Sequence, residues 1–134
     1  MSTNTQVSTS SVNAQADSIA RRLDNGYFNV YDGVQPASSD DPITSQNLLV
    51  SLRFAPVSAP PAVNGVITLS IISDIALAAG DATWYRCLES DNATVVMDGN
   101  VGLVDENLVL PSTISILSGQ LLHISSFQHT VRKQ

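Results

Sequence analysis

The spacing of apolar residues changes near residue 26. Before that point, apolar residues recur at intervals of three and four, at Val12, Ala16, Ile19, Ala20 and Leu23. This spacing places them on one face of an α-helix. We therefore predict a helix over residues 12–25, capped by the hydroxyl of Ser10 or Ser11 and ended by Asn25-Gly26, with the glycine in the left-handed conformation.

The residues before this helix have a different character. Residues 1–11 are polar and show no apolar periodicity, which is typical of a flexible arm that becomes ordered only on a partner. A chain of 134 residues has the size of one domain. We expect residues 12–134 to form that domain.

Beyond residue 26 the apolar residues alternate with polar ones. In residues 47–54, for example, Leu48, Val50, Leu52 and Phe54 fall on one face of a strand. The predicted strands cover residues 27–31, 47–54, 63–72, 82–89, 94–97, 108–110, 113–117 and 121–127. Turns are predicted at Asp-Gly and Asn-Gly pairs, including Asp98-Gly99. About seven to nine short strands after one N-terminal helix predict a mainly β protein, an antiparallel β-sandwich or jelly roll.

The charge composition narrows the classes of function. Only 13% of residues are charged and the net charge is -6, the opposite of what a general nucleic-acid binder needs. No apolar run is long enough to cross a bilayer, and the start lacks the features of a signal peptide. We therefore expect no nucleic-acid partner, no membrane partner and synthesis in a cytoplasm.

Few residues suggest catalysis. Cys87 is the single cysteine, so it forms no internal disulfide, and it could act as a nucleophile only with a base such as His123. Its alternating surroundings instead indicate a small hydrophobic residue of a strand. The carboxylate pairs Asp40-Asp41 and Asp105-Glu106 lie next to each other in polar segments, which favours solvated side chains over acid–base work. We predict that the chain is not an enzyme.

Metal ligands are equally sparse. His123 and His129 lack a third ligand nearby in the sequence. Asp91, Asn92 and Asp98 could offer oxygen atoms to calcium, but they lack the spacing of a calcium loop. We therefore expect no metal ion and no cofactor.

Five segments together resemble a set of small proteins encoded by tailed bacteriophages and prophages. The segments are ARRLDNG at 20–26, VYDGVQP at 30–36, ATWYRCLESD at 82–91, DGNVG at 98–102 and SGQLLHISSF at 118–127. The resemblance implies a virion protein. A small β-sandwich in this setting is most similar to a capsid decoration, or cement, protein, which binds the outside of the shell and stabilises it non-covalently.

This resemblance implies particular partners. They are the major capsid protein and a second or third copy of the chain, and the location is the capsid surface of a virion assembled in a bacterial host. The candidate contact residues, from the helix, the strand that follows it and the proline-rich segment 55–62, are Val12, Ile19, Leu23, Tyr27, Tyr31, Pro56, Pro60 and Pro61. Deletion of residues 1–11 is expected to weaken capsid binding and to leave the fold intact.

Three alternatives stay open at this point. The apolar stripe of the helix could cover one end of its own sandwich instead of a partner. The protein could belong to a tail, baseplate or fibre. It could also be a carbohydrate-binding module, which would require Trp84 or Tyr31 to be exposed, whereas burial of both would count against it.

Overall fold

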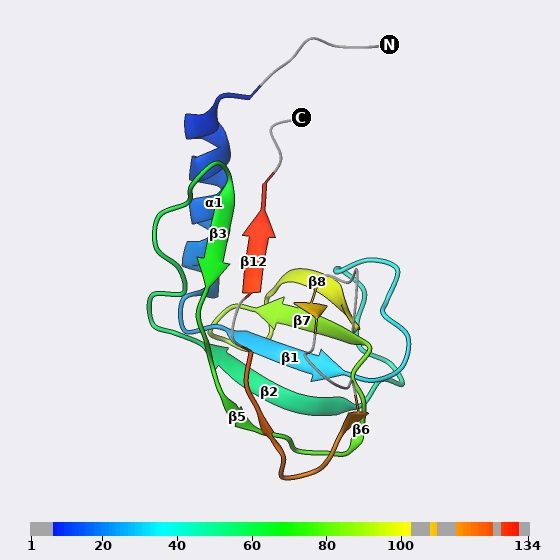
Figure 1. Cartoon of the computed structure of the whole chain (residues 1–134). Coiled ribbons are helices and arrows are strands. Elements are labelled where there is room, and N and C mark those ends of the chain that lie inside the picture. The colour runs from blue at the N-terminus through cyan, green and yellow to red at the C-terminus, as the bar shows by residue number, and fades with distance from the viewer. Residues whose placement is uncertain (1–6, 103–107, 110–114, 125–126, 132–134) are drawn as a thin grey trace.

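The computed structural model of this chain describes residues 7–102, 108–109, 115–124 and 127–131 (Figure 1). It is mainly β with one N-terminal helix, which confirms the predicted fold class. The helix α1 spans Thr9–Leu23. The strands are β1 Tyr27–Tyr31, β2 Leu48–Phe54, β3 Val66–Leu69, β4 Ile71–Ile72, β5 Asp74–Ile75, β6 Gly80–Asp81, β7 Trp84–Leu88, β8 Val95–Gly102, β9 Leu108–Val109, β10 Ser115–Ile116, β11 Leu121–Leu122 and β12 Phe127–Thr130.

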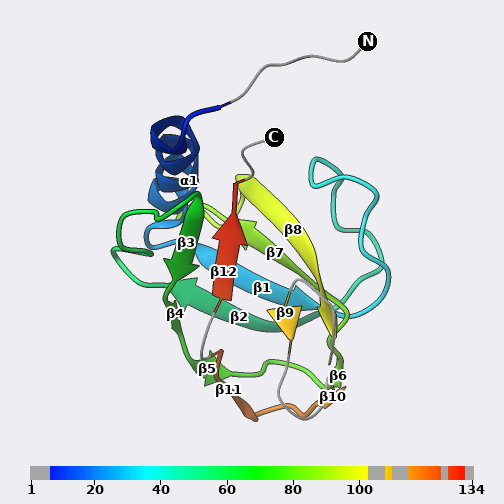
Figure 2. The ribbon, with the colours of Figure 1, turned by 45° about the horizontal axis from the view of Figure 1, so that its top comes forward.

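One large sheet organises the fold. Its strand order is β4-β2-β1-β7-β8-β9, and its neighbouring strands are antiparallel except for β8 and β9, which are parallel. Three smaller antiparallel pairs accompany it, β3–β12, β5–β11 and β6–β10. In Figure 2 the β3–β12 pair lies across the large sheet, with α1 beside β3. This gives a sandwich-like arrangement of two layers with the helix at one end.

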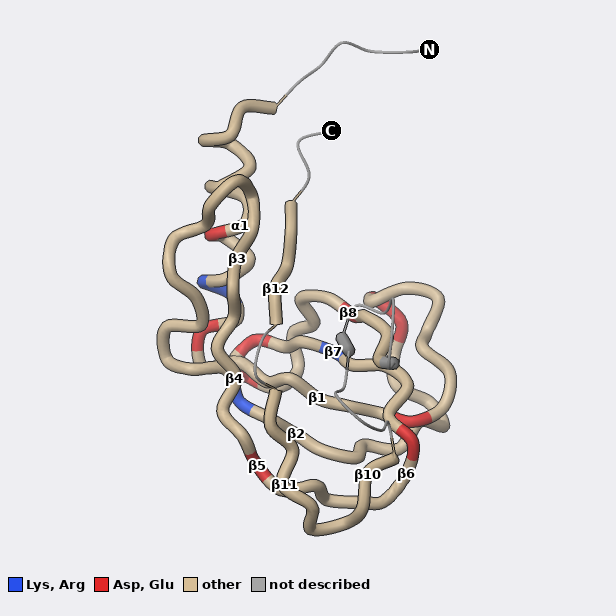
Figure 3. The backbone as a smooth tube through the Cα atoms, in the orientation of Figure 1, with Lys and Arg blue, Asp and Glu red and all other residues tan. Residues whose placement is uncertain are grey.

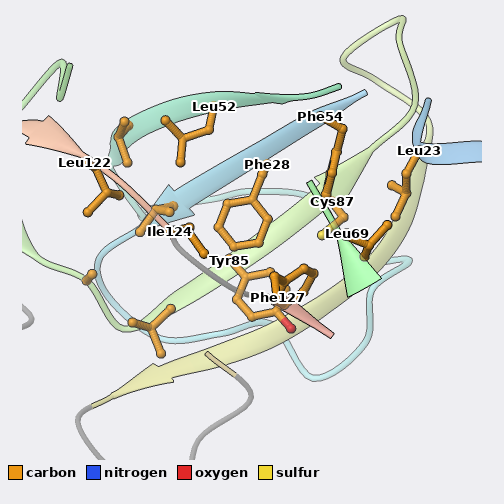
Figure 4. Packing of buried hydrophobic residues seen from close by; sticks show 14 of the residues in the cluster. Leu23, Phe28, Leu52, Phe54, Leu69, Tyr85, Cys87, Leu122, Ile124 and Phe127 are labelled. Atoms are coloured by element: carbon orange, nitrogen blue, oxygen red, sulfur yellow. The ribbon is translucent and has the colours of Figure 1, made fainter. Parts of the chain in front are cut away.

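Aromatic residues fill the space between the layers (Figure 4). Phe28 of β1 stacks on Tyr85 of β7 at 4.7 Å between ring centroids. It also makes edge contacts with Phe54 and Phe127, at 6.0 and 5.2 Å. Because Phe127 comes from β12, this cluster joins the second layer to the large sheet. The alternation predicted for residues 47–54 is confirmed on this face, since Val50, Leu52 and Phe54 are buried.

The helix also contributes to the core, but its predicted start was wrong. Val12, Ala16, Ala20 and Leu23 are buried, so the apolar stripe of the helix covers this chain's own core. The helix begins at Thr9, and its cap is Ser8, whose Oγ accepts from the Ser11 amide at 3.1 Å. Ser10 and Ser11 are instead part of the first turn. The predicted arm was therefore too long at its end, and its residues 1–6 lie outside the described residues.

The end of the helix also needs a correction. Asn25, not Gly26, adopts the left-handed conformation, with φ of 58°. A side chain at Gly26 would overlap the carbonyl oxygen of Leu88 and lie 2.8 Å from that of Leu23. The glycine is thus required for close approach of the helix end to β7, and the asparagine takes the turn, which its short polar side chain tolerates.

The predicted turn at Asp98-Gly99 was wrong, because β8 runs through both residues without interruption. Gly99 lies opposite Tyr85 in the ladder between β7 and β8. A Cβ atom at this position would overlap the Tyr85 ring. Here glycine makes room for a core aromatic side chain, a role that the sequence pair Asp-Gly does not distinguish from a turn.

Candidate functional site

The residues considered for catalysis are engaged in the fold. Cys87 is fully buried within the large sheet, and burial together with the charge of Asp98 raises the pKa of its thiol well above the ordinary value. His123 is exposed, and its Nδ1 pairs with the Ser73 hydroxyl at 2.6 Å. Burial lowers the pKa of His129 in β12. Neither histidine side chain is seen to form a hydrogen bond with the Cys87 thiol. A buried, protonated thiol is a poor nucleophile.

The carboxylates considered for calcium also have protein partners. Asp91 accepts hydrogen bonds from the Thr94 hydroxyl and from the Thr94 and Ala93 amides, which lower its pKa. Both oxygens of Asp98 accept from Arg86 at 2.8 Å. Within the described residues, no group of three or more His, Cys, Asp or Glu side chains is placed to hold a metal ion. Asp41 accepts from the Ser38 amide in an exposed loop, and Asp105-Glu106 lies outside the described residues.

The aromatic residues considered for sugar binding are buried. Trp84 is 0% exposed and Tyr31 is 8% exposed. Their rings stack on each other at 4.7 Å, and the indole Nε1 donates to the Asp32 carbonyl at 3.0 Å. Burial of both side chains counts against a carbohydrate platform made from them.

The predicted contact residues divide into two groups. Val12, Leu23 and Tyr31 are buried inside this chain, so the helix stripe covers its own core and could reach a partner only by unfolding. Ile19 is half-buried against the same core. Tyr27 is half-buried under the Arg53 guanidinium, 4.1 Å from its ring centroid.

The second group stands on the surface. Pro56, Pro60 and Pro61 are exposed, and so are two valines that the sequence analysis did not single out, Val57 at 65% and Val63 at 67%. We call residues 55–63 the proline loop. It leaves the end of β2 and passes beside α1 before β3 begins (Figure 1). Apolar side chains gathered on an exposed loop typically mark a contact surface.

The proline loop is fixed to α1 by a line of hydrogen bonds. Asp17 accepts from the Ala62 amide at 2.8 Å, Arg21 donates to the Ala59 carbonyl at 3.0 Å, and Asp24 accepts from the Ser58 amide at 2.8 Å. The Ser58 hydroxyl, itself fully buried, donates to the carbonyl of Ala20 at 2.6 Å. The loop therefore has a buried polar backbone anchor and an exposed apolar outer side.

These anchoring side chains were missed by the sequence analysis. They follow helical spacing on the polar side of α1, together with Asn13, which accepts from the Gly65 amide at 2.7 Å. Polar residues at such spacing usually form a solvated helix face. The signal that could have revealed them is the proline-rich segment that follows, because its backbone amides need partners.

The charge at the helix end strengthens the anchor. Burial by itself would raise the pKa of the Asp24 carboxyl, but hydrogen bonds from Ser58 and the nearby Arg21 outweigh burial, and the pKa is lowered from its ordinary 3.8. The Arg21 Nε lies 2.9 Å from the Asp24 carboxylate. Asp24 thus holds the loop best when it is ionised.

We predict a pH-dependent loss of stability from this anchor. Because the pKa of Asp24 is lower in the folded state, the carboxylate's stabilisation is complete above the ordinary pKa and is lost as pH falls through the lowered one. Asp24→Asn should reduce the free energy of unfolding by about 1–2 kcal/mol at neutral pH, and this difference should close in acid. Urea unfolding across the pH range tests this, with Asp40→Asn in an exposed loop as the unaffected control. A difference that stays constant into acid would contradict the anchor's charge dependence.

The comparisons with known proteins add no relative. No family model, curated protein or solved structure matches this chain. Among the described residues, no helix is both long and apolar enough to span a membrane. The anchored proline loop is the surface feature on which the proposed function rests.

Proposed function

We propose that this chain is a structural protein of a bacteriophage virion that binds the outside of the capsid shell and stabilises it without covalent bonds. The observation that carries the proposal is the proline loop, which exposes Pro56, Val57 and Pro60 while its backbone is fixed to α1. The phage context comes from the resemblance of the five sequence segments. The proposed partner of the loop is the major capsid protein.

The physics of the loop suits this task. A segment that is already fixed loses little conformational entropy when it docks, so more of its contact energy appears as affinity. Its exposed side chains are apolar and bring no charge that must be desolvated. Many copies bound to one shell act together, so modest affinity at each site is enough to stabilise the particle.

A tail, baseplate or fibre role is the second candidate, since the same loop could dock on those parts. The first experiment therefore locates the chain in the particle. Phage particles from the strain that encodes it are separated into heads and tails on a gradient, and its copies are counted by mass spectrometry. Many copies per head are expected. A few copies confined to tails would overturn the capsid role, and absence from both fractions would overturn the virion role altogether.

A loop variant tests the contact itself. Val57→Glu places a charge on the proline loop, and we expect it to reduce the copies bound to purified heads by about tenfold or more, because an unpaired charge is costly in an apolar contact. Val34→Glu is the matched control, since Val34 is also exposed, at 80%, but lies in another loop. Equal head occupancy of both variants would remove the proline loop from the contact.

The test of the N-terminal arm needs a shorter deletion than residues 1–11. That deletion also removes the Ser8 cap and the first turn of α1, so it would disturb the helix that anchors the loop. Removal of residues 2–6 alone leaves the cap in place. Reduced head occupancy after this shorter deletion is the result that would assign the arm a role in binding.

A further inference from the structure

A second apolar surface lies on the small sheet of β5 and β11 and on the turns beside it (Figures 1 and 2). Four large side chains on it are 54–66% exposed: Ile75, Leu77, Leu117 and Leu121. We call them the leucine face. Alternate residues of the same segments, Ala76, Ile116 and Leu122, are buried. Sheets with one solvated side usually alternate apolar and polar residues. Here the exposed side carries large apolar residues next to the exposed Ser73–His123 pair.

The backbone holds the leucine face together. Ile75 and Leu121 are opposite each other in the antiparallel ladder. The Ala76 amide donates to the Gln120 carbonyl at 2.7 Å, and the Gly119 amide donates to the Ala76 carbonyl at 2.9 Å. The Leu77 amide donates to the carbonyl of Leu49 in β2 at 2.7 Å, which ties the small sheet to the large one. The face is therefore built into the fold and does not consist of side chains on a loose segment.

We infer that the leucine face pairs with the leucine face of a second copy of this chain. The inference deepens the proposed function, on which it rests for the expectation of a self-associating module. The area of the face favours a second copy as the occupant, and the distribution of charge around the face permits one.

The area matches what a dimer requires. At their observed exposures, the four residues together present roughly 450 Å² of surface, most of it apolar, a patch size that is often functional on a monomer. A standard interface covers about 800 Å² on each partner. Somewhat more than half of that area, or roughly 450–500 Å², is apolar. Two leucine faces in contact would thus provide the apolar part of one ordinary interface.

The charge distribution permits the approach of an identical chain. Each copy has a net charge of -6, so two copies repel each other across most orientations. Residues 75–80 and 115–124 contain no Asp, Glu, Lys or Arg. In Figure 3 the tube around β5 and β11 is tan apart from one acidic segment on β5. Contact through this face keeps the acidic groups of both copies at its rim.

A two-fold symmetric contact suits a face with an apolar centre and acidic groups around it. In such a contact the same patch serves both partners, so each residue of the leucine face occurs twice in the interface, once from each copy. A single substitution therefore removes two buried side chains and weakens the dimer by twice the effect of one. Because the rim is acidic and the centre apolar, added NaCl should tighten the dimer by screening repulsion.

Sedimentation of the full-length chain over a range of concentrations tests the inference in the absence of any capsid. We expect twice the mass of the chain, and at least about 100-fold weaker association for Leu121→Ser, because two leucine side chains lose their burial. Leu117→Ser, in the turn between β10 and β11, should act in the same direction and does not alter a strand. Val34→Ser is the matched exposed control and should leave the dimer intact.

Several outcomes would overturn the inference. These are a monomer at all concentrations, a trimer, or a dimer that is unaffected by both leucine variants. A monomer whose head occupancy falls with Leu121→Ser would assign the face to the capsid protein, and one that binds neutral lipid vesicles would assign it to a membrane. Because sedimentation needs no phage head, its failure is distinguishable from failure of the proposed capsid role.

Discussion

Asp98→Asn is expected to lower the free energy of unfolding by about 3–5 kcal/mol, because it leaves the Arg86 charge buried without its partner. The two side chains are each only 4% exposed, and the Arg86 Nε and Nη2 donate to the two Asp98 oxygens at 2.8 Å. These hydrogen bonds are the main reason that the pKa of Arg86 is raised. Urea unfolding of the purified variant measures the loss.

A double variant separates the cost of the orphaned charge from the worth of the pair. Arg86→Met with Asp98→Leu removes both charges and keeps apolar volume, and such replacements are often neutral or stabilising. We expect it to unfold near the wild-type midpoint. A loss below about 1 kcal/mol for Asp98→Asn alone would show that the Arg86 charge reaches water or another acid in the variant.

Phe28→Ala is expected to cost about 3–5 kcal/mol, the range found for removing a buried phenylalanine side chain. The ring is fully buried and contacts three others, Phe54, Tyr85 and Phe127. Since Phe127 belongs to β12, the cavity would lie between the two layers and loosen their packing. Thermal and urea unfolding both measure the effect, and Phe28→Leu should recover about half of the loss because it refills part of the cavity.

The neighbouring residue provides the matched control. Tyr27 lies on the opposite side of β1, half-buried, with the Arg53 guanidinium over its ring. Tyr27→Ala should therefore cost about 1 kcal/mol, the size of a partly exposed cation–π contact with some packing. Equal losses at Phe28 and Tyr27 would contradict the position of the aromatic cluster between the layers.

The two proposals assign separate tasks to the two exposed apolar surfaces. The proline loop lies beside α1, whereas the leucine face lies on the small sheet of β5 and β11 (Figures 1 and 2). A decoration protein that both pairs with its own kind and docks on a shell needs two such surfaces. We therefore expect a Val57 variant to lower capsid occupancy without changing self-association. We expect a Leu121 variant to weaken self-association without changing the docking of a single chain, because the two sites share no residue.

Local patterns predicted the elements because they depend on local geometry. The spacing of Val12, Ala16, Ala20 and Leu23 predicted the helix and its apolar side, and the alternation after residue 47 predicted β2 and its core face. The Asn64-Gly65 pair forms the turn expected of Asn-Gly, with φ of 51° and 78°, and the predicted strand over 63–72 was wrong to include it, because β3 begins at Val66. In each case the residues that carry the signal are neighbours in the chain, so their preferences needed no distant partner.

The errors share a different cause. Asp98-Gly99 has the composition of a turn, but Gly99 is placed within β8 to admit the Tyr85 ring, and Asp98 is placed there to pair with Arg86. Gly26 was expected to take the left-handed conformation, and it is needed instead for contact with Leu88 of β7. A local pattern does not show which distant side chain will occupy the space beside a residue.

The sequence by itself determined the mainly β class and the N-terminal helix, because backbone preferences and apolar periodicity act over a few residues. Only the tertiary structure decided which apolar residues stay outside. Val12 and Leu23 went into the core, while Leu117 and Leu121, equally apolar, stayed on the surface. The reason is that burial depends on which strands pair and what covers each face, and these contacts join residues far apart in the chain.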